Sequence, residues 1–121
     1  MRLTDRDADV MNVLWEQGPS TVAEVRAHLG PRLAYTTVLT MLRTLEAKGA
    51  VTRSKEGRAH RYMARVARAS ARRRALMEVA GKFFRGSTAG LITHLVENER
   101  LNEAEIARLR ELLDRRTRDP K

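Results

Sequence analysis

Histidine and serine are the side chains that most often carry catalysis or metal binding, and here their placement favours neither role. His28, His60 and His94 fall in three separate predicted elements, without the spacing of zinc ligands. The serines lie in no nucleophile motif, no glycine-rich phosphate loop is present, and the chain has no cysteine. The sequence therefore predicts neither an enzyme nor a protein that binds a metal or another cofactor.

Arginine is the abundant chemical group, because the chain holds 20 Arg and 4 Lys against 15 acidic residues. A guanidinium binds phosphates and guanine edges bidentately. The excess lies in residues 32–65, which carry eight basic and two acidic side chains, whereas residues 1–31 have a net charge of −2. The middle segment is therefore predicted to bind a polyanion, and the pattern favours nucleic acid.

Three predicted helices position this basic segment. Thr4 is expected to cap the first helix, and Thr21 with Glu24 forms a capping box that opens the second. The third is predicted from about Tyr35 to Lys48, with a glycine after it as the stop signal. Gly-Pro pairs at 18–19 and 30–31 separate the three helices.

The predicted third helix has one apolar face and an opposite face of small polar side chains. The apolar face consists of Val38, Met41, Leu42 and Leu45. A helix that lies against base edges needs small side chains there, because bulk would hold it out of the groove. The predicted base contacts are Thr36, Thr37, Thr40 and Arg43, and the predicted phosphate contacts beside them are Arg32 and Tyr35.

Residues 50–64 alternate in the manner of a two-stranded hairpin, with the turn expected at Glu56-Gly57. Long cationic side chains gather around this turn, which suits contacts with the DNA backbone rather than with bases. The predicted backbone contacts are Arg53, Lys55, Arg58, His60 and Arg61.

From about Ala67 the chain is predicted to be helical again, and Asn102 with Glu105 forms a capping box for the last helix. The apolar stripes of these helices are too long for the small N-terminal core to cover. A second copy of the chain would cover them, which predicts a homodimer on an inverted-repeat DNA site. The predicted interface residues are Leu91, Ile92, Leu95, Ile106, Leu109, Leu112 and Leu113.

Three helices followed by a two-stranded hairpin within 65 residues is the element order of a winged helix-turn-helix. The predicted fold class is mainly α with a small β-hairpin. Residues 1–66 are expected to form the winged-helix DNA-binding domain, and residues 67–121 a helical dimerisation domain. A non-specific architectural protein that binds nucleic acid is the alternative function.

The segments AYTTVLTMLRTLEAKG and EGRAHRY, together with VLW and the Thr-x-x-Glu box, resemble the penicillinase-repressor family. The resemblance covers nearly the whole chain. It implies a dimeric winged-helix repressor that binds a palindromic operator in double-stranded DNA and controls antibiotic-resistance or stress genes. It also implies a partner, a membrane sensor protein that triggers proteolysis of the repressor within the dimerisation domain.

Two features depart from the family pattern. The beta-lactamase-type members are cut at an Asn-Phe bond, whereas the aligned pair here is His94-Leu95, which becomes the predicted cleavage site on resemblance alone. The copper-responsive members carry a C-terminal cysteine motif that this chain lacks. No apolar run approaches the roughly 20 residues of a membrane helix and no signal peptide is visible, so a cytoplasmic protein without membrane insertion is expected.

Overall fold

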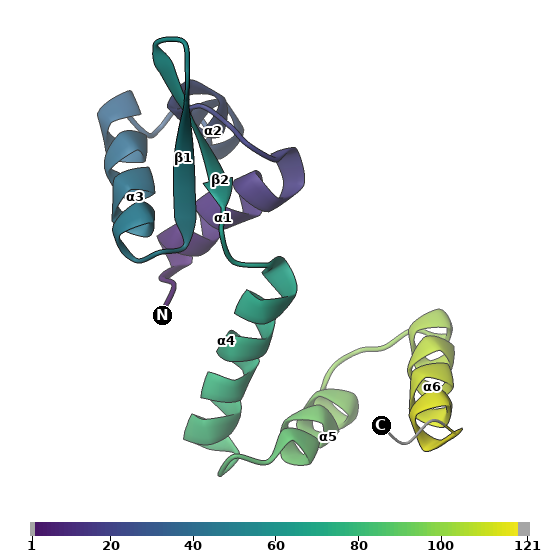
Figure 1. Cartoon of the computed structure of the whole chain (residues 1–121). Helices are drawn as coiled ribbons and strands as arrows, with labels where there is room; N and C mark the ends of the chain where they lie inside the picture. Colours follow the sequence, from purple (N-terminus) through teal and green to yellow (C-terminus); the bar gives the residue numbers. More distant parts are fainter. Residues whose placement is uncertain (1, 119–121) are drawn as a thin grey trace. The chain divides into compact units, whose positions relative to one another are not determined.

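The computed structural model describes residues 2–118, which form six helices and one two-stranded antiparallel sheet (Figure 1). The elements are, in chain order, α1 (Asp5–Gln17), α2 (Val22–Leu29), α3 (Tyr35–Ala47), β1 (Val51–Glu56), β2 (Ala59–Ala64), α4 (Arg68–Phe83), α5 (Thr88–Asn98) and α6 (Glu103–Arg118). This is the element order of a winged helix followed by helices, so the predicted fold class is confirmed.

The chain separates into two compact units, Met1–Arg73 and Arg74–Lys121, and the division falls within α4. The first turn of α4 therefore belongs to the unit that contains α1, α2, α3 and the hairpin. A functional boundary between residues 66 and 67 stays a prediction.

Local capping explains where the helices begin. Thr21 and Glu24 form the predicted reciprocal box at the start of α2, and Asn102 and Glu105 do the same before α6. Thr4 caps α1 as predicted, and Asp7 completes a box there by accepting a hydrogen bond from the Thr4 amide at 2.9 Å. Each box satisfies amide groups that the first helical turn leaves without partners.

The core of the first unit lies where α1, α2, α3 and the hairpin meet. The apolar face predicted for α3 is largely buried, with Val38, Leu42 and Leu45 fully shielded from water. They pack in one cluster with α1, α2 and the sheet, and the largest fully buried side chain of the cluster is Tyr62. Burying a side chain of this size stabilises the fold by about 1.5–3 kcal/mol.

The hairpin is attached to this core through β2. Tyr62 exchanges two backbone hydrogen bonds with Ser20, of 2.8 and 2.9 Å, so the turn between α1 and α2 adds a short bridge to the sheet. Glu56 pairs with Ala59, and the turn consists of Gly57 and Arg58. The prediction of a turn at Glu56-Gly57 is therefore wrong by one residue. Gly57 has a φ of 63°, as the first position of the favoured two-residue hairpin turns requires.

One partly buried ion pair joins α1 to the end of α3. Lys48 Nζ donates to Asp7 Oδ2 at 2.6 Å, and the Asp7 side chain is only 9% exposed. Burial opposes ionisation of this carboxyl, but hydrogen bonds from Lys48 and Thr4 outweigh that effect and hold the pKa of Asp7 below its ordinary value.

Trp15 fixes the path of the chain as it leaves the hairpin. Its indole Nε1 donates to the Val66 carbonyl oxygen at 2.9 Å, and the Arg68 guanidinium lies 5.6 Å from the ring centroid. The start of α4 is thereby held against α1.

The second unit differs in that its helices expose their apolar side chains. Over the described residues, no two of α4, α5 and α6 pack extensively against each other. Ala80 and Leu91 are buried, and the Phe84 and His94 rings meet edge to face with centroids 5.7 Å apart. After α4 the chain turns through Arg85 and Gly86, which have positive φ values of 52° and 80°.

Candidate nucleic-acid interface

The candidate interface is built on α3, whose outward face consists of small side chains. All four predicted base contacts lie exposed on this face, opposite the side that packs into the core: Thr36, Thr37, Thr40 and Arg43. Thr37, at the edge of this face by helical periodicity, is exposed as well. Thr44 is exposed on the same helix and lies outside the set of predicted base contacts.

The hydroxyl groups on this face are partly committed to the helix itself. Thr40 Oγ1 donates to the Thr36 carbonyl oxygen, and Thr44 Oγ1 donates to the Thr40 carbonyl oxygen, each at 2.9 Å. Because each of these hydroxyl groups already donates its hydrogen to a carbonyl oxygen, it can only accept a hydrogen bond from a ligand. Thr40 therefore offers an acceptor and a methyl group, which suit an amino group and a thymine methyl at base edges.

The predicted phosphate contacts flank the start of α3. Arg32 and Tyr35 are both exposed, and Tyr35 is 51% accessible. Arg26 Nε donates to the Leu33 carbonyl oxygen at 2.7 Å, which fixes the turn between α2 and α3. No side chain caps the first turn of α3, so its amide groups and positive dipole end remain open to an anion.

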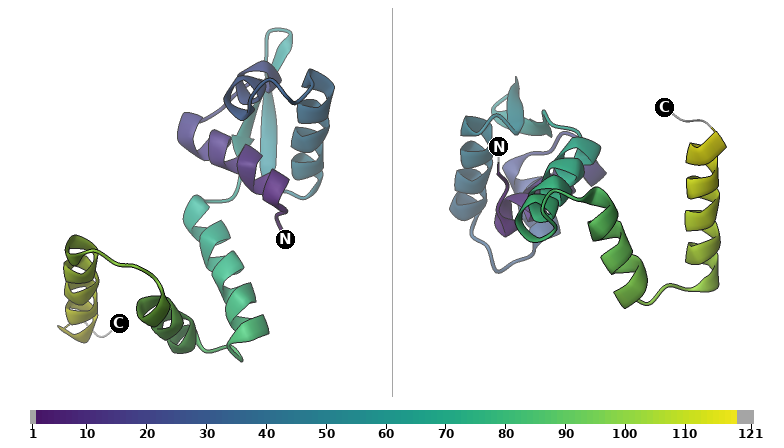
Figure 2. Two further views of the ribbon diagram at one scale, coloured as in Figure 1. Left: turned by 180° about the vertical axis from the view of Figure 1, so that it is seen from behind. Right: turned by 90° about the horizontal axis from the view of Figure 1, so that it is seen from below.

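The hairpin lies beside α3, and its turn projects past the helices of the unit (Figures 1 and 2). The strand register places Arg53 opposite Tyr62 and Lys55 opposite His60, on the face of the sheet that carries the buried Val51 and Tyr62 side chains. Arg61 lies on the other face, and Arg58 lies in the turn. The five cationic side chains predicted to contact the DNA backbone from the hairpin therefore lie on different faces and do not form one surface.

The cations of the interface divide into paired and unpaired groups. Arg53 forms an ion pair with Glu46 of α3 at 3.2 Å, and Arg61 is paired with Glu24 and Glu56. No ion pair within residues 2–118 involves the other four, which are Arg32, Arg43, Lys55 and Arg58. Unpaired cations carry the full charge that a phosphate attracts, so these four form the strongest electrostatic part of the surface.

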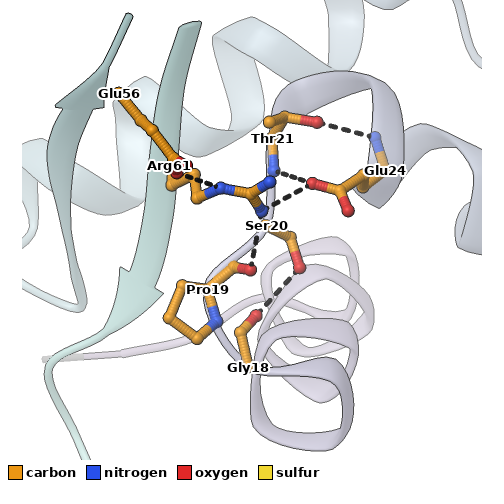
Figure 3. Close-up of polar contacts among 7 residues, drawn as sticks. All are labelled: Gly18, Pro19, Ser20, Thr21, Glu24, Glu56 and Arg61. Carbon is orange, nitrogen blue, oxygen red and sulfur yellow. Dashed lines mark hydrogen bonds and ion pairs between the residues drawn. The ribbon is translucent and has the colours of Figure 1, made fainter.

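The Arg61 guanidinium joins three segments of the first unit (Figure 3). Its guanidinium donates to Glu56 Oε2, to Glu24 Oε1 at 2.9 Å and to the Pro19 carbonyl oxygen at 3.3 Å. The hydrogen bond with Glu56 and the charges of both carboxylates raise the pKa of Arg61 further above its ordinary value. Hydrogen bonds from Thr21, reinforced by Arg61, lower the pKa of Glu24.

The two carboxylates of this network are functional candidates that the sequence pattern does not indicate. The sequence predicts Glu24 only as part of a capping box and Glu56 only as part of a turn. A turn at Gly57-Arg58 places Glu56 and Arg61 on one face of the sheet, two pairs apart, but no local pattern distinguishes that turn from one at Glu56-Gly57.

His60 is half-buried on the inner face of the hairpin, and its Nδ1 has no hydrogen-bond partner among the described residues. His28 lies on α2 and His94 on α5. Within residues 2–118, His, Asp and Glu side chains form no cluster able to hold a metal ion.

The residues predicted to form a dimer interface are mostly exposed. Leu91 is the exception, because it is buried within its own chain. The other six range from 37% to 62% accessible: Ile92, Leu95, Ile106, Leu109, Leu112 and Leu113. Phe83 of α4 is 76% accessible and extends the apolar surface of this unit beyond the predicted set.

The predicted cleavage site lies inside a helix. His94 and Leu95 are in the middle of α5, and Asn98 Nδ2 donates to the His94 carbonyl oxygen at 2.9 Å.

None of the helices among residues 2–118 combines the length and the apolar character that crossing a bilayer requires.

Comparison with known sequences supports the assignment of the whole chain to one family. A family model described as penicillinase repressor matches residues 3–115. The penicillinase repressor of Bacillus licheniformis is 26% identical over 115 residues, which cover 93% of this chain and 90% of that protein. The methicillin resistance regulatory protein MecI of Staphylococcus aureus is 22% identical over 116 residues, which cover 94% of each chain.

The similarity to one mycobacterial protein is higher and shorter. The transcriptional regulator BlaI of Mycobacterium tuberculosis is 45% identical over 64 residues, which are 50% of this chain. The match spans about half the length of that relative, 46%.

Solved structures support the fold. A MarR family protein from Bacillus stearothermophilus superposes with a TM-score of 0.54 at 17% identity, covering 98% of this chain and 76% of that one. The transcriptional regulator Tm0710 from Thermotoga maritima gives 0.53 at 22% identity, covering 97% and 78%. At these identities the likeness concerns the fold alone.

Proposed function

Because this chain belongs to the penicillinase repressor family, we propose that it is a sequence-specific DNA-binding transcriptional repressor. In the proposed complex α3 enters the major groove of a double-stranded operator. The observation that carries this proposal is the outward face of α3, where threonines surround the unpaired Arg43. Arg43 contacts guanine O6 and N7, and Thr36, Thr37 and Thr40 contact neighbouring base edges.

Backbone contacts hold the protein in register on the duplex. Arg32 and Tyr35 contact phosphates at the start of α3, and the unpaired Lys55 and Arg58 do so from the wing. Arg53 is already paired with Glu46 and His60 is half-buried, so we expect weaker contributions from these two residues. The names of the relatives for penicillinase and methicillin resistance favour antibiotic-resistance genes as targets, and stress genes are the alternative.

The repressor acts as a homodimer on an inverted repeat. An exposed apolar surface of this extent on a free chain is typical of a protein interface. The exposed leucines and isoleucines of α5 and α6 support a two-fold interface between copies. Two linked α3 helices then contact half-sites separated by one helical turn of DNA or a small multiple of it.

Proteolysis in the second unit is the proposed means of release, with a membrane sensor protein as the source of the signal. A cut between His94 and Leu95 would detach α6 from the rest of the interface. Since that bond lies within α5, the helix must unwind locally before a protease can bind it.

Selection from a pool of random duplexes tests the central proposal. The protein should enrich sequences that contain an inverted repeat, and the enriched duplex should outcompete unrelated duplex by about 10³-fold or more in a gel-shift assay. Equal competition by both duplexes would contradict a repressor and favour the non-specific architectural alternative.

A further inference from the structure

Arg61 connects the hairpin, here called the wing, to α2 and to the turn before it, on the face of the sheet opposite the one that carries Arg53. Its guanidinium contacts Glu56 at the end of β1, Glu24 of α2 and the Pro19 carbonyl oxygen of the turn before α2 (Figure 3). One side chain on β2 therefore joins the tip of the hairpin to the N-terminal end of a helix.

The α2 end of this connection is held firmly. Glu24 Oε1 accepts a hydrogen bond from the Thr21 amide at 3.0 Å, and the Glu24 amide donates to Thr21 Oγ1 at 3.2 Å. Glu24 cannot follow a moving wing without breaking the cap of α2. The paired backbone hydrogen bonds of Ser20 and Tyr62 fix β2 itself at the adjacent residue.

The charges in this cluster leave little attraction for a phosphate. One guanidinium lies between two carboxylates, so the group of Arg61, Glu24 and Glu56 has a net charge of −1. Arg58, three residues earlier, is exposed in the turn and forms no ion pair within the described chain. The two arginines of the wing are therefore suited to different tasks.

We propose that Arg61 is a positioning residue that holds the wing at a fixed angle to α2, so that Lys55 and Arg58 meet the DNA backbone while α3 occupies the groove. The proposal rests on the proposed function in one respect, that the wing contacts DNA. In this proposal Arg61 does not contact a phosphate, whereas the sequence predicts that it does. It fixes the orientation of the wing through its ion pairs with Glu24 and Glu56.

The difference between arginine and lysine makes this proposal testable. A lysine can replace an arginine that acts on a phosphate as a point charge, because the charge is retained. It cannot reproduce the planar fork with which Arg61 reaches three acceptors in different directions. Arg61→Lys should therefore hold the wing less firmly than arginine does. Arg58→Lys, the matched control in the turn, should behave like the unaltered protein.

The first experiment uses the free protein and needs no DNA. Backbone ¹⁵N relaxation of residues 53–61 is measured for the unaltered chain, Arg61→Lys, Arg61→Ala, Glu56→Gln and Arg58→Lys. We expect lower order parameters in the hairpin for the Arg61 and Glu56 variants, unchanged values in α1 and α3, and no change for Arg58→Lys. Hairpin order parameters that stay the same in Arg61→Ala would overturn the proposal.

The second experiment uses a duplex selected by the unaltered protein from a random pool, with an unrelated duplex of equal length for comparison. Arg61→Ala and Glu56→Gln should each reduce the ratio of the two affinities by about fivefold. Arg61→Ala should leave the dependence of log affinity on log salt unchanged, whereas Arg58→Ala should flatten it by about one unit.

A flattening by one unit in Arg61→Ala, or tighter specific binding in Glu56→Gln, would identify Arg61 as a phosphate ligand and overturn the proposal. If the pool yields no enriched duplex, the proposed repressor function fails instead. The relaxation measurements then still decide whether Arg61 holds the wing.

Discussion

Val25, Val38 and Leu42 in the first unit are completely shielded from water, whereas Ile92, Leu109 and Leu113 in the second are 51%, 40% and 62% exposed. Both units are built from amphipathic helices with similar caps. In the first unit the apolar faces of the helices pack against each other and against the hairpin, whereas α4, α5 and α6 form no such core among the residues that the structure describes. An amphipathic sequence therefore defines which face of a helix is to be buried, but not whether the covering surface comes from the same molecule.

The largest effect on operator binding is expected from a change in the apolar surface of the second unit that a second copy of the chain is proposed to cover. Leu109→Asp places a charge in the proposed interface, so it should dissociate the dimer and weaken operator binding by about 10²–10⁴-fold, because the avidity of two linked sites is lost. Sedimentation and gel-shift titration measure the two effects.

Ala107→Asp is the matched control for this variant, since it adds the same charge to the opposite, exposed face of α6. It should remain dimeric and bind the operator. A Leu109→Asp protein that stays dimeric with normal affinity would show that the interface lies elsewhere and would weaken the contrast between the two units.

Matched core truncations sharpen the same contrast. Leu42→Ala should lower the free energy of unfolding of the first unit by about 2–5 kcal/mol, because it opens a cavity in a closed core. This loss should not depend on protein concentration.

Leu112→Ala, in contrast, removes a side chain that is 39% exposed on its own chain, so its effect should appear through association and grow with dilution. Urea denaturation at two protein concentrations, followed by circular dichroism, distinguishes the cases. Concentration-independent losses of equal size in both variants would mean that the second unit is stable without a partner.

A change at Arg43 tests whether α3 of the first unit makes the base contacts, without affecting the proposed dimer interface. Arg43→Ala should cost about 1–3 kcal/mol of operator binding and relax the preference at one base pair, while the dimer stays intact. Binding to duplexes with a single altered base pair measures this. Undiminished selectivity would remove Arg43 from the base contacts.

The smallest expected effect concerns acid stability of the first unit. The pKa of Asp7 lies below its ordinary value of 3.8, so the ionised carboxylate stabilises the folded state. That contribution is complete above the unfolded-state pKa and is lost as the pH falls through the lower folded-state pKa.

Asp7→Asn should therefore lower the free energy of unfolding by about 1 kcal/mol at pH 7 and have progressively less effect below the ordinary pKa. Denaturant titration of both proteins across the acid range is the measurement. A difference that stays constant down to the lowest pH would assign the effect of Asp7 to packing rather than to its charge.

Local patterns determined most of the helices, because their causes lie within a few residues. The boxes of Thr21 with Glu24 and of Asn102 with Glu105 need only a spacing of three residues. The buried face of α3 follows from helical periodicity, which also predicted that its threonines and Arg43 would face outward. The order of helices and hairpin was enough to predict the fold class.

The hairpin shows where local patterns were insufficient. Its existence and its cations were predictable, but the register was not, because Glu56-Gly57 and Gly57-Arg58 are both acceptable turn sequences. Pairing of β2 with Ser20 and burial of Tyr62 select the observed register, and these contacts join residues 42 positions apart. Moving the two-residue turn by one position shifts the pairing by two residues and places Glu56 in β1, on the face that carries Arg61, so a turn at Glu56-Gly57 hides the network of Arg61.

The sequence by itself determined that this chain has a hydroxyl-rich helix face, a cationic hairpin and apolar stripes in excess of one small core. Only the tertiary structure decided which cations remain unpaired. Arg53 meets Glu46 of α3, and Arg61 meets Glu24, which is 37 positions away in the chain. The physical reason is that capping and periodicity act between near neighbours, whereas the pairing of charges depends on where the packed core places distant backbone segments.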